Sequence, residues 1–311
     1  MYQNHRIAVV VPAHNEASHI SSVLRNLPEW VDHIVVVDDA SLDGTSEAAL
    51  KSGDRRLDLI RNSKNLGVGG SMLAGYRKAL ELGADIVVKM DGDDQMPPEY
   101  LPALLKALLE EGMDYAKGNR FLAGESLQKM PRLRLFGNIV LTFLNKLASG
   151  YWNVFDPQNG FTAVKSSVLK RLEFKSFHLG YFFENDMLIH LNLLNCRVKD
   201  VAVPARYGDE KSDLNPFKIG VSFPLLLMRR FAYRIYQKYI LRDFSPIAMF
   251  LILGSLLFAW GFGFGAYLWL HTRATGLPTP TGTIMLSLLP LILGFQLLLQ
   301  AIVLDIQETP K

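Results

Sequence analysis

Two long uncharged runs near the C-terminus constrain the fold of this chain more than any other feature. The first, SPIAMFLILGSLLFAWGFGFGAYLWL, covers residues 245–270, and the second, TIMLSLLPLILGFQLLLQAIVL, covers residues 283–304. A helix of roughly 20 apolar residues crosses the core of a bilayer, so each run is long enough to span one. The first run is apolar on every face and carries Trp260, Tyr267 and Trp269, which favours a membrane helix over a buried helix of a soluble protein. We expect a hairpin of two transmembrane helices.

The basic residues around these runs predict an orientation. Lys218, Arg229, Arg230, Arg234, Lys238 and Arg242 precede the first run, whereas the linker HTRATGLPTPTG offers only His271 and Arg273. The positive-inside rule then places the N-terminal domain and the C-terminal tail in the cytoplasm. We expect no signal peptide, because MYQNHRIAVVVPAHNE leads directly into a strand-like run. Residues 215–243 mix basic with aromatic and apolar side chains, which predicts interfacial helices on anionic lipid; a solvated connector helix is the alternative.

The overall composition excludes several classes of protein. A formal net charge of +3 provides no basic field for nucleic acid, so no nucleic-acid partner is expected. The single cysteine, Cys196, excludes an internal disulfide framework and fits a reducing compartment. Two spans are too few for the inverted repeats of a secondary transporter.

The first 110 residues alternate between strand-like and helix-like segments. RIAVVVP, HIVVVDD, LDLIRN and DIVVKMD predict buried parallel strands, and helices are expected at residues 16–27, 45–51, 69–82 and 98–110. This alternation predicts a doubly wound α/β sheet, in which ligands bind at the carboxyl ends of the strands. The polar clusters PAHNE, DDASLDGT, NLGVGG and DGDDQ each follow one predicted strand. We therefore expect them to form one site.

Two of these clusters indicate what the site binds. NLGVGG lacks a dinucleotide fingerprint, because Met72 stands where a third glycine would be; its glycines allow either a tight loop close to a ligand or a purely structural turn. In the fourth cluster, Asp91 and Asp93 are followed by Gln95. Oxygen ligands at this spacing suit Mg²⁺ or Mn²⁺, which would neutralise a diphosphate leaving group. A lone D-x-D motif is common in exposed turns, but the presence of three other polar clusters at the same edge favours a metal-binding site.

In this order, VVVPAHNEASHI, IVVVDDASLDGT, NLGVGGSMLAGYRKAL and VVKMDGDDQMPPEY resemble family 2 glycosyltransferases of the GT-A fold. GNRF, RLRLFGN, DPQNGFTAVKSSVL and YFFENDMLIHLN bring the resemblance close to the branch of dolichyl-phosphate mannose synthase and other polyprenyl-phosphate glycosyltransferases. It covers most of residues 7–203. It implies inverting transfer of a sugar from a nucleotide donor to a polyprenyl phosphate.

The resemblance also implies roles for particular residues. It assigns nucleotide-sugar binding to Pro12, Asn15, Glu16, Asp38 and Asp39, and we add Gly67 and Asp91. It assigns binding of the metal ion and the diphosphate to Asp91, Asp93 and Gln95, with Gly92 in place of the usual small middle residue. For the acceptor phosphate it offers Arg120, with Arg132 and Arg134 as alternatives for a further arginine. The expected catalytic residues are Asp93, Arg120, Glu184 and Asp186.

Several of these assignments keep a structural alternative. Either Glu184 or Asp186 aligns with the base of related enzymes, but both also suit the start of a helix over residues 185–194. Asp156 in the D-x-x-G-F-like segment is either close to the sugar, with Gly160, or a turn cap. A phosphate acceptor is already largely dianionic at neutral pH, so the reaction would not require a base. The amphipathic residues 132–147 form either an acceptor route or a core helix, and residues 209–215 are expected to be a mobile loop over the site.

We therefore expect a GT-A catalytic domain at residues 1–208, a loop with interfacial helices at 209–244 and a transmembrane hairpin with a short tail at 245–311. The predicted function is metal-dependent transfer from a UDP- or GDP-linked sugar to dolichyl or undecaprenyl phosphate, and a homo-oligomer is compatible with it. The alternatives are a family 2 transferase with a hydroxyl acceptor in polysaccharide synthesis, and a non-catalytic membrane scaffold. A processive synthase is disfavoured, because LMRRFAYR lacks the Gln and Trp of its Q-x-x-R-W motif.

Overall fold

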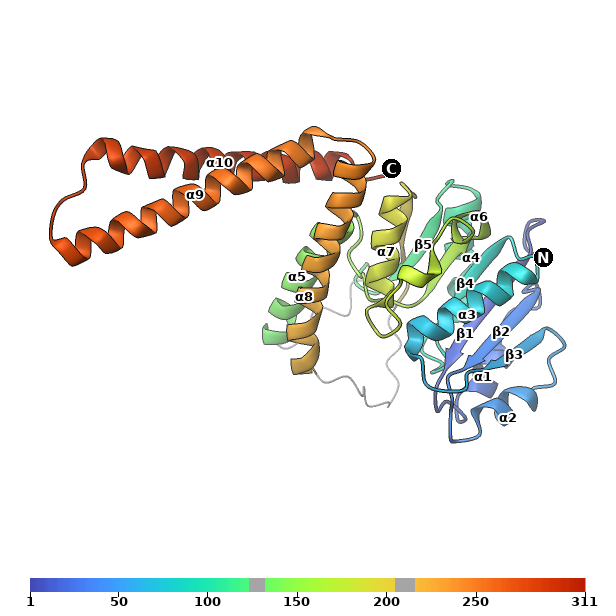
Figure 1. Cartoon of the computed structure of the whole chain (residues 1–311). Helices are drawn as coiled ribbons and strands as arrows, with labels where there is room; N and C mark the ends of the chain where they lie inside the picture. The colour runs from blue at the N-terminus through green and yellow to red at the C-terminus, as the bar shows by residue number, and fades with distance from the viewer. Residues whose placement is uncertain (123–131, 205–215, 311) are drawn as a thin grey trace. The chain divides into compact units, whose positions relative to one another are not determined.

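The computed structural model describes residues 1–122, 132–204 and 216–310 (Figure 1). They divide into two compact units, one within residues 1–230 together with Pro310, and the other Phe231–Thr309. The loop predicted at residues 209–215 lies outside the described residues.

The first unit is built on a mixed seven-stranded sheet with the order β3-β2-β1-β4-β6-β5-β7. Its strands are β1 (Ile7–Ala13), β2 (His33–Asp38), β3 (Leu57–Arg61), β4 (Ile86–Lys89), β5 (Tyr115–Asn119), β6 (Thr162–Lys165) and β7 (Val198–Ala202). The four strands predicted from β-branched runs are confirmed, and they pair in parallel. Beyond them, β6 is antiparallel to both β4 and β5, while β7 is parallel to β5. The carboxyl ends of β1, β2, β3 and β4 therefore share one edge.

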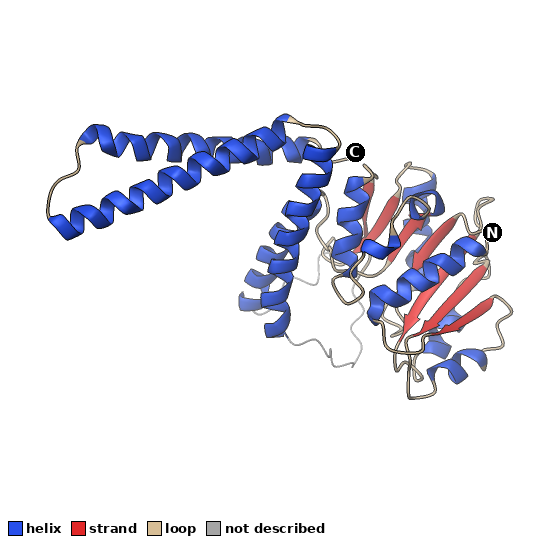
Figure 2. Cartoon of the chain, in the orientation of Figure 1, coloured by secondary structure: helices blue, strands red, loops and turns tan. Residues whose placement is uncertain are grey.

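Helices cover both faces of this sheet, as Figure 2 shows. The helices of this unit are α1 (Ile20–Asn26), α2 (Thr45–Leu50), α3 (Gly67–Glu81), η1 (Pro98–Tyr100), α4 (Leu101–Leu109), α5 (Arg132–Ser149), α6 (Ser166–Leu169), η2 (Phe174–Ser176), α7 (Phe183–Leu193) and most of α8 (Pro216–Ile235). Alternate residues of β1 enter two cores: Val9 packs with α1 and α4, and Val10 packs with α3 and α7. The predicted doubly wound α/β architecture is confirmed.

The sequence misplaced the start of one helix. The helix expected at residues 16–27 begins only at Ile20, because residues 14–19 form a loop in which Asn15 adopts a left-handed backbone with φ of 60°. Helix α5 is buried on one side and exposed on another. Its Asn145 is buried and donates a hydrogen bond to Asn185 of α7 (2.5 Å), whereas Ile139 and Phe143 on its surface are 58% and 51% exposed.

The second unit contains a π-helical turn (η3, Tyr236–Leu241) and two long helices, α9 (Pro246–Thr275) and α10 (Thr281–Gln307). The two helices pack closely, since a Cβ at Gly261 would lie 2.5 Å from the backbone nitrogen of Leu291. Trp260 and Phe262 remain 60% and 65% exposed. Both helices have a mean hydropathy of 2.1 and are long and apolar enough to cross a membrane. The two predicted apolar helices are thus confirmed as helices.

Candidate active site

A cavity of about 680 Å³ opens at the edge where the carboxyl ends of β1, β2, β3 and β4 meet. Each of the four polar clusters supplies part of its lining. Its walls include Pro12, His14, Glu16, Asp39, Asn65, Gly67, Ser71, Lys89, Asp91, Asp93, Arg120, Gln158, Gly160, Gly180, Tyr181, Glu184 and Phe223. Eight residues of the predicted site are among them: Pro12, Glu16, Asp39, Gly67, Asp91, Asp93, Arg120 and Glu184.

The two carboxylates of the D-x-D motif face this cavity together. Asp91 Oδ1 lies 3.1 Å from the ammonium of Lys89, and Asp93 Oδ1 accepts the backbone N–H of Gln95 at 3.1 Å. Gln95 is not among the described residues that line the cavity. Gly160 keeps space open beside Asp91, because a Cβ there would lie 2.7 Å from Asp91 Oδ2.

The donor set fits a hard cation that is only partly coordinated by protein. The described residues contain no group of three His, Cys, Asp or Glu side chains that would hold a metal by themselves. Two carboxylates open to a cavity suit Mg²⁺ or Mn²⁺, which usually retain waters and share substrate phosphates. Asp91 and Asp93 are the residues that would hold such an ion.

Lys89 is a site residue that the sequence reasoning missed. It lies on β4, is 2% exposed, and pairs with Glu184 of α7 as well as with Asp91. Burial opposes its charge, but the carboxylates of Asp91 and Glu184 outweigh burial and raise the pKa of Lys89 above its ordinary value. The signal in the sequence was a lysine inside the otherwise apolar strand DIVVKMD. Glu184 is thereby fixed at the cavity wall.

Arg120 borders two cavities. Its Nε and one terminal nitrogen donate to the two carboxylate oxygens of the buried Asp156 at 2.8 and 2.9 Å. Arg120 also lines a smaller cavity of about 60 Å³, together with Phe121, Leu141, Thr142, Pro157, Asn185, Phe223 and Leu227. A bidentate pair fixes the plane of a guanidinium. Arg120, which lines both cavities, is therefore held in one orientation.

Lys117 supports the segment behind Arg120 and was also missed. It is fully buried on β5 and donates to the backbone carbonyl of Asn159. Burial, partly offset by the carboxylates of Asp156, Glu184 and Asp200, lowers the pKa of Lys117 to about 8. It does not line the large cavity, so it acts on that cavity through the backbone next to Gly160.

Two predicted nucleotide residues shape loops outside the cavity lining. Asp38 is buried and accepts hydrogen bonds from the Ser41 backbone N–H and the Ser46 hydroxyl. Burial opposes its ionisation, but these bonds and the charge of Arg61 hold the pKa of Asp38 below its ordinary value. Asn15 accepts the backbone N–H of Leu42 at 3.0 Å.

The remaining predicted residues also lie away from the cavity lining or outside the description. Asp186 is fully buried, and its carboxylate accepts from the His178 backbone and from Arg230. Arg132 and Arg134 fall in the first turn of α5, but their side chains lie outside the described residues.

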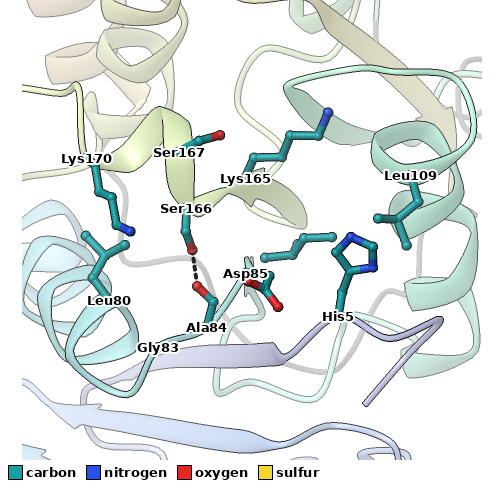
Figure 3. A pocket seen from close by; sticks show the side chains of 11 residues that line it. His5, Leu80, Gly83, Ala84, Asp85, Leu109, Lys165, Ser166, Ser167 and Lys170 are labelled. Carbon is teal, nitrogen blue, oxygen red and sulfur yellow. Dashed lines mark hydrogen bonds between the residues drawn. The ribbon is translucent and has the colours of Figure 1, made fainter.

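A second cavity, of about 380 Å³, lies at the opposite edge of the sheet (Figure 3). It is lined by residues beside the amino ends of β1 and β4, among them His5, Asp85, Lys165 and Lys170. The Ser166 hydroxyl there donates to the carbonyl of Ala84, and both Asp85 and Lys170 are exposed. No residue of the predicted site lines this cavity.

Comparison with known proteins agrees with this geometry. The sequence profile described as "Glycosyl transferase family 2" matches residues 8–173. The chain belongs to glycosyl transferase family 2. The resemblance inferred from the motifs is confirmed. The family match includes Asp91, Asp93 and Arg120, but it ends before α7, so Glu184 and Asp186 lie beyond it.

Relatives of this family 2 chain include named enzymes. A UDP-N-acetylglucosamine–dolichyl-phosphate N-acetylglucosaminyltransferase of Methanococcus voltae is 32% identical over 53% of this chain and 72% of its own length. An undecaprenyl-phosphate mannosyltransferase of Micrococcus luteus is 29% identical over 64% of this chain and 82% of its own. Among solved structures, glucosyl-3-phosphoglycerate synthase of Mycobacterium tuberculosis, in complex with Mn²⁺ and UDP, matches with a TM-score of 0.55. At 22% identity over 74% of this chain and 80% of that one, this likeness supports the fold.

Proposed function

We propose that this protein is a membrane-anchored, inverting, metal-dependent glycosyltransferase that moves a sugar from a UDP- or GDP-sugar to dolichyl or undecaprenyl phosphate. The observation that carries the proposal is the position of Arg120, a cation that is held by Asp156 and lines both the large cavity and the smaller one. The names of the relatives from Methanococcus voltae and Micrococcus luteus support the class of acceptor.

The large cavity would receive the donor. Pro12, Glu16, Asp39 and Gly67 lie on the side formed by β1, β2 and the start of α3, and would contact the nucleotide. Bound by Asp91, Asp93 and the diphosphate, Mg²⁺ or Mn²⁺ would neutralise the charge of the leaving group. Gln95 would act through its backbone bond to Asp93. Glu184, held by Lys89, would accept hydrogen bonds from hydroxyls of the sugar.

The acceptor phosphate would bind at Arg120. A phosphate monoester is largely dianionic at neutral pH, so one of its oxygens attacks the anomeric carbon without prior proton removal. The new carbon–oxygen bond forms as the bond to the nucleotide diphosphate breaks, and the configuration inverts. Arg120 would hold the phosphate in line, and Asp156 keeps Arg120 in place. Arg132 or Arg134 would contribute further positive charge from α5.

The long apolar helices fit an acceptor that lives in a bilayer. We propose that α9 and α10 span the membrane, with the catalytic domain (residues 1–208) and the interfacial segment (209–244) at its cytoplasmic face. Exposed apolar side chains on α5 and α8, such as Phe143 and Met228, would lie at the lipid surface near the prenyl chain.

The test uses the full chain in detergent with undecaprenyl or dolichyl phosphate, Mn²⁺ and a panel of UDP- and GDP-sugars. We expect release of nucleoside diphosphate that requires the lipid, stops with EDTA and yields a lipid-linked sugar. Turnover only with a hydroxyl acceptor would favour the polysaccharide alternative. Nucleotide binding without turnover on any acceptor would favour a non-catalytic scaffold.

A further inference from the structure

One rim of the large cavity is a loop that depends on contacts from other elements. This rim loop, residues 176–181, lies between η2 and α7 and contributes Gly180 and Tyr181 to the cavity lining. On one side it packs against the start of α3: the backbone N–H of Gly70 donates to the carbonyl of Leu179 at 3.1 Å. A Cβ at Gly69 would lie 2.5 Å from the His178 carbonyl, so only glycine permits this approach. The rim loop is thus fitted tightly to α3.

On its other side the rim loop is held by Asp186. The Asp186 Oδ2 atom accepts the backbone N–H of His178 at 2.7 Å. The same oxygen accepts a hydrogen bond from Arg230 of α8 at 2.6 Å, and Arg230 also donates to the carbonyl of Ser176 at 2.8 Å. Because Asp186 is fully buried, its negative charge requires a nearby cation. Arg230 meets both the carboxylate and the loop.

His190, the other titratable group beside Asp186, does not replace Arg230 as that cation. Its ring stacks on Phe177 with centroids 4.2 Å apart, and its Nδ1 lies 3.5 Å from Asp186 Oδ1. Burial outweighs the attraction of the Asp186 charge and lowers the pKa of His190. The imidazole is therefore largely neutral at pH 7, and the guanidinium supplies the positive charge.

Arg230 belongs to the face of α8 that packs on the rest of the first unit. Phe223, Leu227 and Arg230 are spaced by four and three residues and so share one side of the helix. Phe223 lines the large cavity and meets Phe182 edge-on at 5.5 Å between ring centroids. The last residues of α8, from Phe231 onward, belong to the second compact unit. One helix therefore joins the cavity wall to the unit that holds the two apolar helices.

We propose that Arg230 is a positioning residue: by pairing with Asp186 it fixes the rim loop, so that the donor cavity is complete only when α8 is docked. The docking of the juxtamembrane helix is then a condition for donor binding. The effect on sugar transfer rests on the proposed function, but the effect on the loop does not.

The test compares two variants that remove the same charge from the same helix, Arg230→Met and the matched control Arg229→Met, whose arginine is exposed. Hydrogen–deuterium exchange of the full chain in detergent reports on the rim loop directly. We expect Arg230→Met to speed exchange at the His178 amide roughly tenfold, as the loss of one charge-assisted contact implies, with no change in β1 or β2. Arg229→Met is expected to leave the loop unchanged, and Arg230→Lys to restore part of the protection.

Titration with UDP and with GDP, each with Mn²⁺, provides the second measurement. We expect Arg230→Met to weaken binding several-fold relative to Arg229→Met. If Arg230→Met does not fold, Asp186→Asn, which keeps the shape of the side chain, tests the same pair. Unchanged exchange in the rim loop of either variant, or equal changes in Arg230→Met and Arg229→Met, would overturn the proposal. If neither nucleotide binds the unaltered chain, the proposed function fails while the exchange result still decides the role of Arg230.

Discussion

The two faces of α7 hold carboxylates that are almost neighbours in the sequence and differ in what they serve. Glu184 lines the large cavity and pairs with Lys89 of the sheet, whereas Asp186 faces away and pairs with Arg230 of α8. Two positions along a helix turn a side chain by about 200°, which places them on opposite sides. The side of α7 on which a carboxylate lies therefore determines whether it faces the cavity or pairs with α8.

The strongest test of this division is a carboxylate on the cavity side. We expect Asp93→Ala to reduce sugar transfer by about a thousandfold, because the diphosphate leaving group would lose its charge neutralisation. Nucleoside diphosphate release measures the effect. The midpoint of thermal unfolding should change little, since Asp93 is only half-buried. Activity close to that of the unaltered chain would remove Asp93 from the metal site.

Arg120 tests whether the orientation of a cation matters as well as its charge. We expect Arg120→Lys to lower kcat/KM for the lipid phosphate by roughly 100-fold, because lysine keeps the charge but loses the bidentate bond to Asp156. The KM for the nucleotide sugar should change much less. Initial rates measured at varied concentrations of the lipid phosphate and of the nucleotide sugar distinguish the effects on the two substrates. An equal loss for both substrates would contradict a role specific to the acceptor.

The comparison within α7 predicts opposite patterns for two isosteric changes. We expect Glu184→Gln to lower kcat by about tenfold or more, because its carboxylate lines the cavity, and to cost less stability than Asp186→Asn, because Lys89 keeps its pair with Asp91. Asp186→Asn should keep most of the kcat but lower the free energy of unfolding by about 2 kcal/mol, since a buried charged pair is broken. Steady-state kinetics of both variants measure kcat, and denaturant unfolding measures the change in stability. A near-total loss of activity in Asp186→Asn would instead support a base at that position and a hydroxyl acceptor.

The sequence predicted the four parallel strands β1 to β4 and the meeting of four polar clusters, because both follow from local patterns, but it did not predict β5, β6 and β7. The β-branched runs define β1, β2 and β4, and parallel strands bring their carboxyl ends to one edge. It could not determine which acidic residues face the cavity. Asp38 and Asp39 are adjacent, yet Asp38 caps its own loop while Asp39 lines the cavity and accepts the backbone N–H of Gly67 at 2.7 Å. Whether an acidic side chain faces the cavity depends on its rotational position on the helix or turn that carries it.

Ion pairs between segments that are distant in the sequence could not be predicted from its local patterns either. Lys89 and Glu184 are separated by 95 positions, and no periodicity connects them. Arg234, counted in the sequence as one of the positive charges beside the membrane, is fully buried and bonded to Asp305 at 2.7 Å. Only tertiary packing determines whether such a charge is free to meet lipid.

The smallest expected effect concerns the two buried lysines, Lys89 on the cavity side and Lys117 behind it. Burial lowers the pKa of Lys117 to about 8, so between about pH 8 and its ordinary value of 10.5 the unfolded chain binds more protons than the folded one. The contribution of Lys117 to stability should therefore rise with pH across this range. Lys89, whose pKa is raised by its two carboxylates, should contribute no such rise there.

Unfolding of the unaltered chain and of Lys117→Met at pH 7.5 and pH 9.0 measures this difference. We expect the stability of the unaltered chain relative to the variant to be greater at pH 9.0, by about 1 kcal/mol, in proportion to the protons exchanged. Lys89→Met provides the contrast and should not show an increase between the same two pH values. A difference that is independent of pH for Lys117→Met would mean that Lys117 remains charged in the folded chain, held by Asp156 and Asp200 more strongly than burial opposes it.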